Sequence, residues 1–455
     1  MIKRVTHVHF IGIGGCGMSG IAEILLKSGY KVSGSDLAET PVTRRLKKLG
    51  VTMFKGHEAG NIAGAGVVVY SSAVPLTNPE ITAANEQHVP VLRRAEMLGQ
   101  LMRMKYSIAV SGTHGKTTTS SMIGNILAEG GLDPTVIVGG IAKKIGSGAV
   151  MGSGSYLVVE ADEFDRSFLK MPSTVAVMTT LEAEHLDCYA NLDEIKDAFV
   201  GFGSQVPFFG CIVLCQDEAT LQDIIPRLKK NVVITYGFSA QSDYRAVERK
   251  FTLHGTSFQV AHQGKILGRI DLNVPGDHNV KNAMAGVAVG LEMGIPFAKI
   301  TRAFRKFEGM RRRFEIKGEK KGVMVVDDYA HHPTEISVTL KAAKDTYRRK
   351  VLAIFQPHLY SRTRDFCREF GQSFFNADTL VVTDIYASRE KPIPGVSGKL
   401  VADAAIDAGH RSVKYLVNPA EIEKFVKKNV KKGDMVITLG AGDIWKIGEK
   451  ILKTL

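Results

Sequence analysis

Residues 7–36 read HVHFIGIGGCGMSGIAEILLKSGYKVSGSD and identify the fold class of the N-terminal part of the chain. The first apolar run, VHFIGI, ends among Gly12, Gly14 and Gly17 in the pattern G-x-G-x-x-G, and a second apolar run ends at Asp36. A strand, a glycine turn, a helix and a second strand form a βαβ unit in which the glycines let the backbone approach a diphosphate. This pattern alone predicts a dinucleotide-binding domain, and the diphosphate that it binds has to be identified from the rest of the chain.

The same alternation of short apolar runs and helical stretches continues to the C-terminus in three blocks. The first block covers residues 1–105, the second restarts with YSIAVSG and covers 106–312, and the third begins near GVMVVDDYA and covers 313–455. Within the second block, residues 245–275 alternate polar and apolar side chains with glycines at the turns, which predicts antiparallel hairpins. We therefore expect an α/β protein of three domains, each built on a mainly parallel sheet.

Composition and charge exclude several classes of protein. The 455 residues are 44% hydrophobic and 23% charged, as in ordinary globular proteins, and no apolar run is long enough to span a membrane. The first residues enter directly into a strand pattern, so we expect no signal peptide. We expect a cytoplasmic protein without membrane insertion, as a monomer or a homodimer. The net charge of +13 comes from dispersed Lys and Arg residues, which predicts a surface that favours small anionic substrates and no specific nucleic acid partner. The scattered cysteines indicate reduced, unreactive thiols; they are Cys16, Cys188, Cys211, Cys215 and Cys367.

A phosphate-binding loop opens the second block in residues 107–131, SIAVSGTHGKTTTSSMIGNILAEGG. An apolar strand leads into the compact form G-x-x-G-K-T, whose small residues let backbone N–H groups approach phosphates, and the following helix N-terminus favours negative charge. Val110 stands where the longer Walker pattern has its first glycine, so the match is to the compact form. Lys116 is predicted to contact the β- and γ-phosphates of ATP or GTP, and Thr117 to ligate Mg²⁺. The residues expected at the nucleotide are Gly112, Thr113, His114, Gly115, Lys116, Thr117 and Thr118.

Acidic residues follow the next two apolar runs. The run YLVVEADEFD, which contains Glu160, and the run AVMTTLEAEHLDCY, which contains His185, each end in a group of carboxylates. Taken alone, both groups are typical of solvated loops with one histidine. Beside a phosphate loop, at the carboxyl ends of parallel strands, they are better interpreted as hard ligands for Mg²⁺ in a phosphoryl-transfer site.

Four further polar segments follow, with chemistry that the residues alone leave open. They are GDHNVKNAM (276–284), GMRRRFE (309–315), DDYAHHPTE (327–335) and FQPHLYSRTRDF (355–366). In the first, Asp277 or His278 could cap a helix, and Asn279 could instead contact an adenine edge. The second is either a basic linker or the source of an arginine that reaches phosphates. Because the adjacent His331 and His332 are poorly suited to chelate one ion, the last two segments are interpreted as sites for anionic substrate groups.

The chain resembles the Mur ligase family along essentially its full length. Ten motifs carry the resemblance, in the order FIGIGGCGMSGIAEIL, SGTHGKTTT, EADEFDRSFL, LEAEHLDCY, DHNVKNA, RRRFE, DDYAHHPTEI, FQPHLYSRTRDF, DIYASREKPIPGVSG and TLGAGDIW. The form G-x-G-G-x-G-M-S-G and the segment DDYAHHPTE are similar to the branch of the family that adds alanine. The resemblance implies a Rossmann-like domain for a UDP-sugar at 1–105, a central P-loop ATPase-type domain at 106–312 and a Rossmann-like domain for the amino acid at 313–455.

The resemblance also implies a reaction of bacterial peptidoglycan precursor synthesis, with ATP and Mg²⁺. ATP would phosphorylate the lactyl carboxylate of UDP-N-acetylmuramate, and the amino group of L-alanine would attack the acyl phosphate. The residues that match catalytic positions are Lys116, Glu160, His185, His331 and Arg362, and those that match the magnesium region are Thr117, Glu160 and His185. Asn279 matches an adenine contact and Arg313 a phosphate contact. Residues that match substrate positions are Gly12, Gly14, Gly15, Gly17, Asp36 at the uridine end, His57, Ser71, Ser72, Arg93, Arg94, Tyr329 and His358.

Two positions depart from the family pattern. Relatives that add later amino acids carry a carbamylated lysine, whose matching position here falls near Phe199 and Val200, with Lys196 out of register, so none is assigned. Leu359 stands where many alanine-adding relatives carry arginine, and leucine cannot make that contact with a carboxylate or phosphate.

Three other functions compete with this interpretation. A nicotinamide-dependent oxidoreductase would use the glycine pattern but would leave SGTHGKTTT without a role. A ligase that joins a whole peptide to UDP-N-acetylmuramate would need a larger amino-acid site. A nucleotide-gated binding protein would keep the ATP site without catalysis.

Overall fold

The computed structural model describes residues 5–71, 73–139, 149–183, 188–253, 255–388 and 390–455. The chain divides into two compact units. The first comprises Met1–Val247, Val260–Gly268 and Lys281–Lys306, and the second comprises Glu248–Gln259, Arg269–Val280 and Phe307–Leu455. The framework consists of three sheets, which have five, ten and six strands in chain order.

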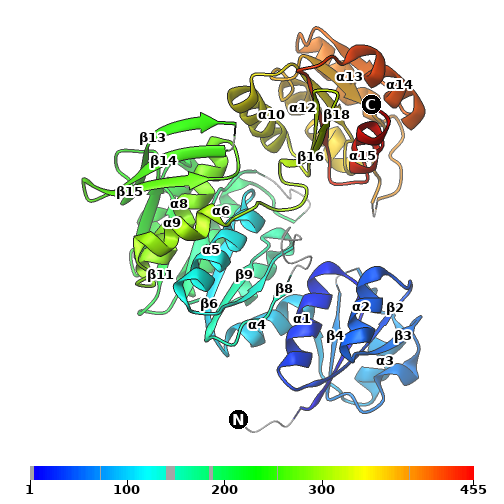
Figure 1. Ribbon diagram of the computed structural model, residues 1–455. Coiled ribbons are helices and arrows are strands. Elements are labelled where there is room, and N and C mark those ends of the chain that lie inside the picture. The colour runs from blue at the N-terminus through cyan, green and yellow to red at the C-terminus, as the bar shows by residue number, and fades with distance from the viewer. Residues whose placement is uncertain (1–4, 72, 140–148, 184–187, 254, 389) are drawn as a thin grey trace. The chain divides into compact units, whose positions relative to one another are not determined.

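The first sheet has five parallel strands in the order β3-β2-β1-β4-β5, flanked by helices (Figure 1). Every residue of β1 and β4 is buried, as expected for strands covered on both faces. The strand order reverses at β1, and ligands of such sheets bind at the carboxyl end of the strands beside that point. The glycine turn lies there. The elements are β1 (His7–Ile11), α1 (Cys16–Lys27), β2 (Lys31–Asp36), α2 (Pro41–Leu49), β3 (Thr52–Lys55), η1 (Ala59–Ile62), β4 (Val67–Tyr70), α3 (Pro79–Glu86), β5 (Val91–Arg93) and α4 (Arg94–Met102).

The second sheet has the order β15-β14-β13-β12-β11-β10-β6-β9-β7-β8. The strands from β12 to β7 in this order run parallel, and β6 lies between β10 and β9, so the strand order also reverses at β6. The phosphate loop connects β6 to α5 at this point. Its first elements are β6 (Tyr106–Ser111), α5 (Lys116–Gly130), β7 (Thr135–Ile137), β8 (Ala149–Val150), β9 (Tyr156–Glu160), η2 (Phe164–Lys170), β10 (Val175–Met178), α6 (Leu192–Ser204), β11 (Cys211–Cys215), α7 (Ala219–Gln222), η3 (Ile225–Leu228) and β12 (Val232–Gly237).

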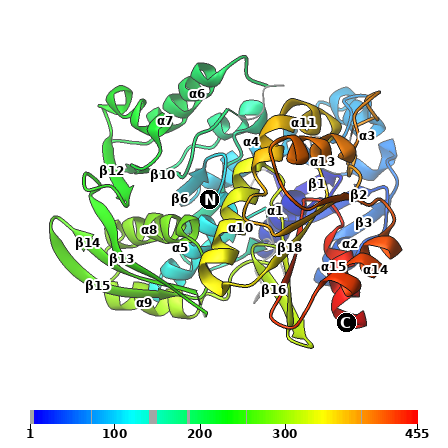
Figure 2. The same cartoon turned by 90° about the horizontal axis from the view of Figure 1, so that it is seen from above.

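Three longer strands and two helices follow β12. They are β13 (Tyr244–Thr252), β14 (Gly255–His262), β15 (Lys265–Leu272), α8 (Asp277–Glu292) and α9 (Phe297–Arg305). Two-residue connections join neighbouring strands of this group, and such short connections require antiparallel pairing. This confirms the predicted hairpins. Helices α5 and α9 pack side by side, as Figures 1 and 2 both show.

The third sheet has the order β16-β17-β21-β18-β19-β20, parallel except for β16 against β17. Alternate residues of β18 enter different cores: Ala353 and Phe355 pack in one, Leu352 and Ile354 in the other. Both faces of this sheet are therefore buried under helices. The elements are β16 (Glu315–Lys320), β17 (Val323–Asp328), α10 (Pro333–Tyr347), β18 (Val351–Phe355), α11 (Tyr360–Asp365), α12 (Cys367–Gln372), β19 (Thr379–Val382), α13 (Gly398–Asp407), β20 (Val413–Tyr415), α14 (Pro419–Asn429), β21 (Met435–Leu439) and α15 (Trp445–Thr454).

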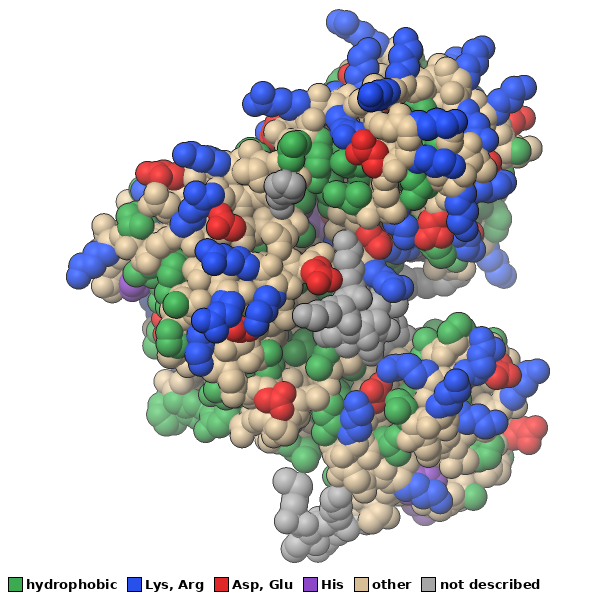
Figure 3. Space-filling model, viewed as in Figure 1, with side chains coloured by type: hydrophobic (Ala, Val, Ile, Leu, Met, Phe, Trp, Pro, Cys, Tyr) green, Lys and Arg blue, Asp and Glu red, His purple; other side chains and the backbone are tan. Residues whose placement is uncertain are grey.

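The architecture confirms the predicted fold class, because all three sheets are mainly parallel and helices connect most of their parallel strands. Among the helices of the described residues, none combines the length and the apolar character that crossing a bilayer requires. On the face drawn in Figure 3, Lys and Arg side chains are spread over both units, interspersed with Asp and Glu. This distribution agrees with the dispersed basic residues of the sequence.

Candidate active site

The phosphate loop is a tight turn in which two glycines have no room for a side chain. Gly112 has φ +139°, and a Cβ there would lie 2.2 Å from the Thr179 hydroxyl. Gly115 has φ +82°, and its Cβ would lie 2.5 Å from Asn282 Oδ1. Gly115 precedes α5 and no side chain caps this helix end. The loop therefore presents backbone N–H groups at a helix N-terminus, the arrangement that binds phosphate.

Lys116 lies inside this loop and is held by carboxylates. Its Nζ donates to the Gly112 carbonyl oxygen at 2.7 Å and to both oxygens of Glu163 at 2.9 Å, and lies 3.8 Å from Asp162 Oδ1. Burial alone would lower the pKa of Lys116, but the charges of Glu163 and Asp162 raise it above the usual range. The lysine is therefore a permanent positive charge, fixed where the sequence predicts a phosphate contact.

Thr117 and Glu160, the two described residues predicted to bind Mg²⁺, are in direct contact. The Thr117 hydroxyl lies 3.0 Å from each carboxylate oxygen of Glu160 and donates to them. Glu160 stands at the end of β9, and its Oε2 also accepts from Gly139 N at 2.7 Å. Carboxylate and hydroxyl oxygens are the ligands that Mg²⁺ prefers. His185, the third predicted ligand, lies outside the described residues.

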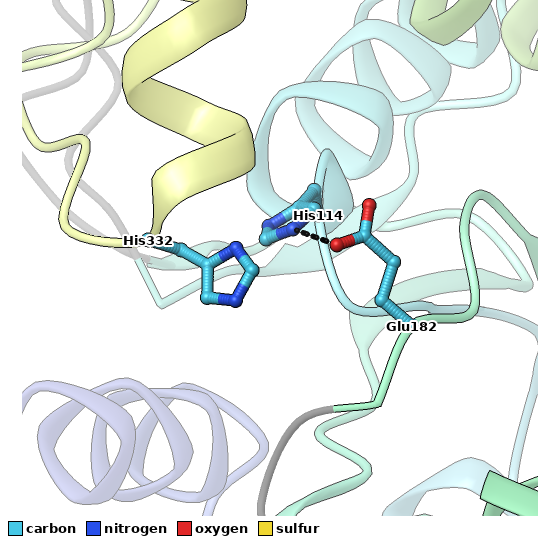
Figure 4. A group of neighbouring side chains, drawn as sticks. All are labelled: His114, Glu182 and His332. Atoms are coloured by element: carbon cyan, nitrogen blue, oxygen red, sulfur yellow. Dashed lines mark ion pairs between the residues drawn. The ribbon is translucent and has the colours of Figure 1, made fainter. Parts of the chain in front are cut away.

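The end of β10 fixes the middle of the loop through Thr179 and Thr180, which the sequence interpretation missed, and through Glu182, which it placed in the acidic group after this strand. His114 N donates to Thr180 Oγ1 at 2.8 Å, Thr179 Oγ1 donates to the His114 carbonyl at 2.5 Å, and Glu182 N donates to Thr113 Oγ1 at 2.9 Å. The His114 ring pairs with Glu182 across 3.5 Å (Figure 4). The third residue drawn in Figure 4, His332, belongs to the other unit.

Asn282 was also missed, and it accepts from Thr119 Oγ1 at 3.1 Å. Glu163 was grouped with the proposed Mg²⁺ ligands, but its carboxylate holds Lys116. Glu163 belongs to the acidic group after β9, and Asn282 to the segment GDHNVKNAM, so the sequence offered a signal for both. Thr118, predicted at the nucleotide, is buried in the first turn of α5.

The glycine turn of the first sheet begins α1 and is closed by Asp36. Gly14 N donates to Asp36 Oδ2 at 2.8 Å, and a Cβ on Gly14 would lie at the same distance from that oxygen. Gly12 has φ +74°, and Gly15 precedes α1 without any side-chain cap. A Cβ on Gly17 would lie 3.2 Å from the side chain of Arg94. Arg94, which is also a predicted substrate residue, therefore packs against Gly17.

The other predicted UDP-sugar residues lie at the same ends of the parallel strands. The Arg93 Nε donates to Tyr70 Oη at 3.1 Å, and the His57 Nδ1 lies 2.9 Å from Ser35 Oγ. Ser71 follows β4 and its N donates to the Ile11 carbonyl at 3.3 Å. Ser72 lies outside the described residues.

Three predicted substrate residues of the second unit meet at the carboxyl ends of β17 and β18. The ring of His331 lies 5.3 Å from the Tyr329 ring and 5.8 Å from the His358 ring, between ring centroids. His331 Nδ1 lies 3.1 Å from Glu335 Oε2. Arg362 is half-buried on α11, directly after this group. Leu359, at the position that departs from the family, is buried with φ +71°, so its side chain belongs to the core.

The two remaining predicted nucleotide residues also lie in the second unit. The Asn279 Nδ2 donates to the Pro275 carbonyl at 2.7 Å. The Arg313 guanidinium stacks over the Tyr329 ring, 5.2 Å from its centroid, and its Nη1 lies 3.5 Å from Glu335 Oε1. The roles assigned to these residues from the family resemblance stay predictions.

Asp328 supports the segment that carries Arg313, and its burial has a consequence for stability. Its Oδ2 accepts from Phe314 N at 2.6 Å and its Oδ1 from Ala330 N at 2.8 Å. Burial raises the pKa of Asp328 to about 6, although the charge of Arg313 and these two backbone donors act against the rise. The native state thus binds a proton that the unfolded chain releases near pH 4, so stability falls as the pH rises from about 4 to about 6.

In the variant Asp328→Asn the side chain at this position stays neutral. We therefore expect the variant not to lose stability through this group as the pH rises from about 4 to about 6. We compare the thermal unfolding midpoint of the variant with that of the unmodified protein at each pH. The midpoint of the variant, minus that of the unmodified protein, should increase as the pH rises from about 4 to about 6 and then stay constant. Calorimetry at several pH values in one ionic strength measures it. A difference that stays constant, or that moves in favour of aspartate with rising pH, contradicts the account.

The site combines a phosphate loop at the reversal point of the second sheet with a second diphosphate-type glycine turn on the first sheet. These features define the class as an α/β nucleotide-binding protein with a phosphate loop. Three family descriptions match the chain in order: Mur ligase family, catalytic domain at residues 7–106, Mur ligase middle domain at 110–290, and Mur ligase, glutamate ligase domain at 312–442. The chain belongs to the Mur ligase family.

Individual relatives are similar over the whole length. The chain is 51% identical over 455 residues to the UDP-N-acetylmuramate–L-alanine ligase of Geotalea uraniireducens, covering 100% of this chain and 99% of that protein. It is 50% identical over 457 residues to the ligase of the same name from Trichlorobacter lovleyi, covering 100% of both. The crystal structure of UDP-N-acetylmuramate–alanine ligase from Thermotoga maritima matches with a TM-score of 0.82 at 30% identity, covering 98% of each chain.

Proposed function

We propose that this chain joins L-alanine to the lactyl carboxylate of UDP-N-acetylmuramate at the expense of ATP, as a step of peptidoglycan precursor synthesis. The observation that carries the proposal is the 51% identity, over the entire chain, to a ligase of this substrate pair. The phosphate loop around Lys116 supports the use of ATP, and the glycine turn around Gly14 supports the binding of a UDP-sugar diphosphate. A UDP-sugar presents a diphosphate just as a dinucleotide does, so the same turn serves both.

The three sections of the chain divide the substrates among them in this proposal. Residues 1–105 bind the UDP-sugar, 106–312 bind ATP, and 313–455 bind the amino acid. The match of three successive Mur ligase descriptions to 7–106, 110–290 and 312–442 supports this division. Tyr329, His331, His358 and Arg362 are the proposed amino-acid residues.

The chemistry begins with a carboxylate, which is a poor electrophile. A carboxylate oxygen attacks the γ-phosphorus of ATP, which breaks the bond to ADP and gives an acyl phosphate with a good leaving group. The amine of L-alanine then attacks the carbonyl carbon, loses a proton, and the tetrahedral intermediate expels phosphate to leave the amide. Lys116, a partly buried and permanent cation, stabilises the charge on the γ-phosphoryl group during transfer.

Thr117 and Glu160 are the proposed holders of Mg²⁺, together with His185. Their fit rests on the contact between the Thr117 hydroxyl and both oxygens of Glu160 at 3.0 Å, which brings two hard oxygen donors together beside the loop. Magnesium held by these residues would offset the negative charge of the nucleotide phosphates. Lys116 and the backbone N–H groups of the loop stabilise the rest of the negative charge on the phosphates.

The proposal is tested by product analysis. The purified protein is incubated with ATP, Mg²⁺ and UDP-N-acetylmuramate, together with L-alanine, glycine, L-serine or a tripeptide in separate reactions. The expected result is UDP-N-acetylmuramoyl-L-alanine, detected by mass spectrometry in equal amount to ADP. A product with the tripeptide but none with L-alanine favours the peptide-adding alternative, and no product with any amine refutes the proposal.

A further inference from the structure

A buried carboxylate lies beneath the glycine turn of the first sheet. Glu80, in the first turn of α3, has no exposed surface. Its Oε1 accepts from Asn61 Nδ2 at 2.6 Å and from Glu58 N at 3.3 Å. Its Oε2 accepts from Ser35 Oγ at 2.6 Å and lies 3.2 Å from His9 Nε2. Both oxygens are therefore occupied as acceptors.

Glu80 is ionised in this surrounding. Burial would raise the pKa of its carboxyl, but hydrogen bonds from His9, Ser35 and Asn61 hold the pKa below its usual range. An ionised carboxylate can only accept hydrogen bonds. The single proton of the Ser35 hydroxyl must therefore point to Glu80.

This direction fixes the proton of a neighbouring histidine. His57 Nδ1 lies 2.9 Å from Ser35 Oγ, and its ring is 14% exposed. The Ser35 hydroxyl uses its only proton in the hydrogen bond to Glu80, so it can only accept a hydrogen bond from His57. Nδ1 of His57 must therefore carry a proton. In the neutral imidazole, Nε2 is then left with its lone pair and is an acceptor.

The same serine also holds the glycine turn. The Ser35 carbonyl oxygen accepts from Gly12 N at 2.9 Å and from Ile13 N at 3.1 Å. The next residue, Asp36, accepts from Gly14 N at 2.8 Å. The end of β2 thus connects the Glu80 carboxylate both to His57 and to the turn that approaches the diphosphate.

We propose that Glu80 is a positioning residue of the UDP-sugar site, which acts through Ser35 to keep the proton of His57 on Nδ1 and to present Nε2 as an acceptor for a hydroxyl or imide N–H group of the UDP-sugar. The inference rests on the proposed function for the identity of the ligand. The proton assignment itself rests on the hydrogen bonds around Glu80 and on the ionised state of its carboxylate.

The variant Glu80→Gln tests the proposal because glutamine has the same shape and only one acceptor. If the amide nitrogen faces Ser35, it donates to Ser35 Oγ, and the serine proton turns toward His57 Nδ1. We expect the proton of His57 to move to Nε2, the KM for UDP-N-acetylmuramate to rise about tenfold, and kcat and the KM for ATP to change less than about twofold.

Two measurements record this outcome. Nitrogen-15 spectra of protein labelled at histidine, recorded well above the ordinary pKa of histidine, distinguish the two neutral tautomers, and His57→Gln assigns the signal. Steady-state kinetics separate KM from kcat. Ser35→Ala provides a second variant, with the same rise in KM expected, in case Glu80→Gln does not fold.

Glu23→Gln is the matched control. Glu23 is a buried glutamate of the same domain, on α1, and pairs with Lys27 and Arg45 at 2.9 Å each instead of with the Glu80 neighbours. For the Glu23→Gln variant, we expect an unchanged KM for UDP-N-acetylmuramate. This should hold even if the thermal unfolding midpoint of Glu23→Gln falls as far as that of Glu80→Gln. Equal rises in KM for both variants would show a general loss of packing and overturn the proposal.

The remaining outcomes separate the inference from the proposed function. If the unmodified protein carries the His57 proton on Nε2, or if Glu80→Gln and Ser35→Ala leave the KM for UDP-N-acetylmuramate unchanged in an active enzyme, Glu80 has no positioning role. If the unmodified protein makes no alanine-containing product, the proposed function fails instead, and the tautomer measurement still decides the proton assignment.

Discussion

Replacing Lys116 with alanine is expected to reduce the rate of ATP-dependent product formation by about 10²–10³-fold or more. The ammonium group is partly buried in the loop, donates to the Gly112 carbonyl, and keeps its charge through Glu163 and Asp162. The other side chains of the loop, Thr113, His114 and Thr117, carry no permanent positive charge that could replace the ammonium at the γ-phosphate. The kcat with saturating substrates measures the effect.

Stability is measured in parallel, because the variant leaves Glu163, which is 3% exposed, without its cation. Rates are compared only at temperatures where the variant remains folded. Lys306→Ala is the matched control. Lys306 pairs with Glu129 at 2.7 Å on the surface, and a surface ion pair contributes little to the free energy of unfolding. A kcat within about threefold of normal in Lys116→Ala would refute the assignment of the phosphate loop.

Replacing Glu160 with glutamine is expected to raise the Mg²⁺ concentration needed for half-maximal rate by about tenfold or more and to lower kcat. An amide keeps one oxygen that can accept from Thr117, so the fold of the loop is preserved, but the negative charge that binds the cation is lost. The rate as a function of Mg²⁺, at constant total ATP, measures the change.

The control for this variant is Glu129→Gln, which removes a carboxylate from the opposite end of α5 and is expected to leave the Mg²⁺ titration unchanged. Superimposable titrations for Glu160→Gln and the unmodified protein would show that Glu160 does not hold the cation. A lower rate at every Mg²⁺ concentration, without a shift of the midpoint, would point to a structural role of the Thr117–Glu160 contact.

The strand ends that carry the site were predictable from the sequence because their signals are local. The glycines around Gly14 and Gly115 mark places where the backbone must turn sharply, and a strand before and a helix after each of them complete the unit. The structure gives both turns the positive φ angles or close contacts that only glycine accommodates. The predicted pair of Thr117 and Glu160 was also found in contact, since Glu160 ends β9 and Thr117 follows the loop after its neighbour β6.

Contacts between distant segments were not predictable in the same way. Glu163 lies 47 residues from Lys116, and its position near the ammonium depends on how the end of β9 turns beside the loop. Glu80 lies on a helix, without a motif, 45 residues from Ser35, and only the packing of α3 against the sheet brings the two together. Charge and spacing alone distinguish neither of them from solvated glutamates.

The glycine pattern that opens the chain does not require redox chemistry. Asp36 closes the turn by accepting from Gly14 N, so at least one of its oxygens serves the turn itself. The oxidoreductase alternative leaves the phosphate loop and its lysine without a role, whereas the Mur ligase family accounts for both sites along the chain. A binding protein without catalysis would keep the same arrangement of Lys116, Thr117 and Glu160, so product formation separates it from a ligase.

The transfer of oxygen from substrate to phosphate tests the central claim most directly. UDP-N-acetylmuramate labelled with oxygen-18 in both lactyl carboxylate oxygens is incubated with ATP, Mg²⁺ and L-alanine. Since one carboxylate oxygen attacks the γ-phosphorus and leaves with it, we expect each released phosphate to carry one oxygen-18, in equal amount to the alanine-containing product. Unlabelled phosphate, or phosphate release that does not depend on L-alanine, would contradict ligation through an acyl phosphate.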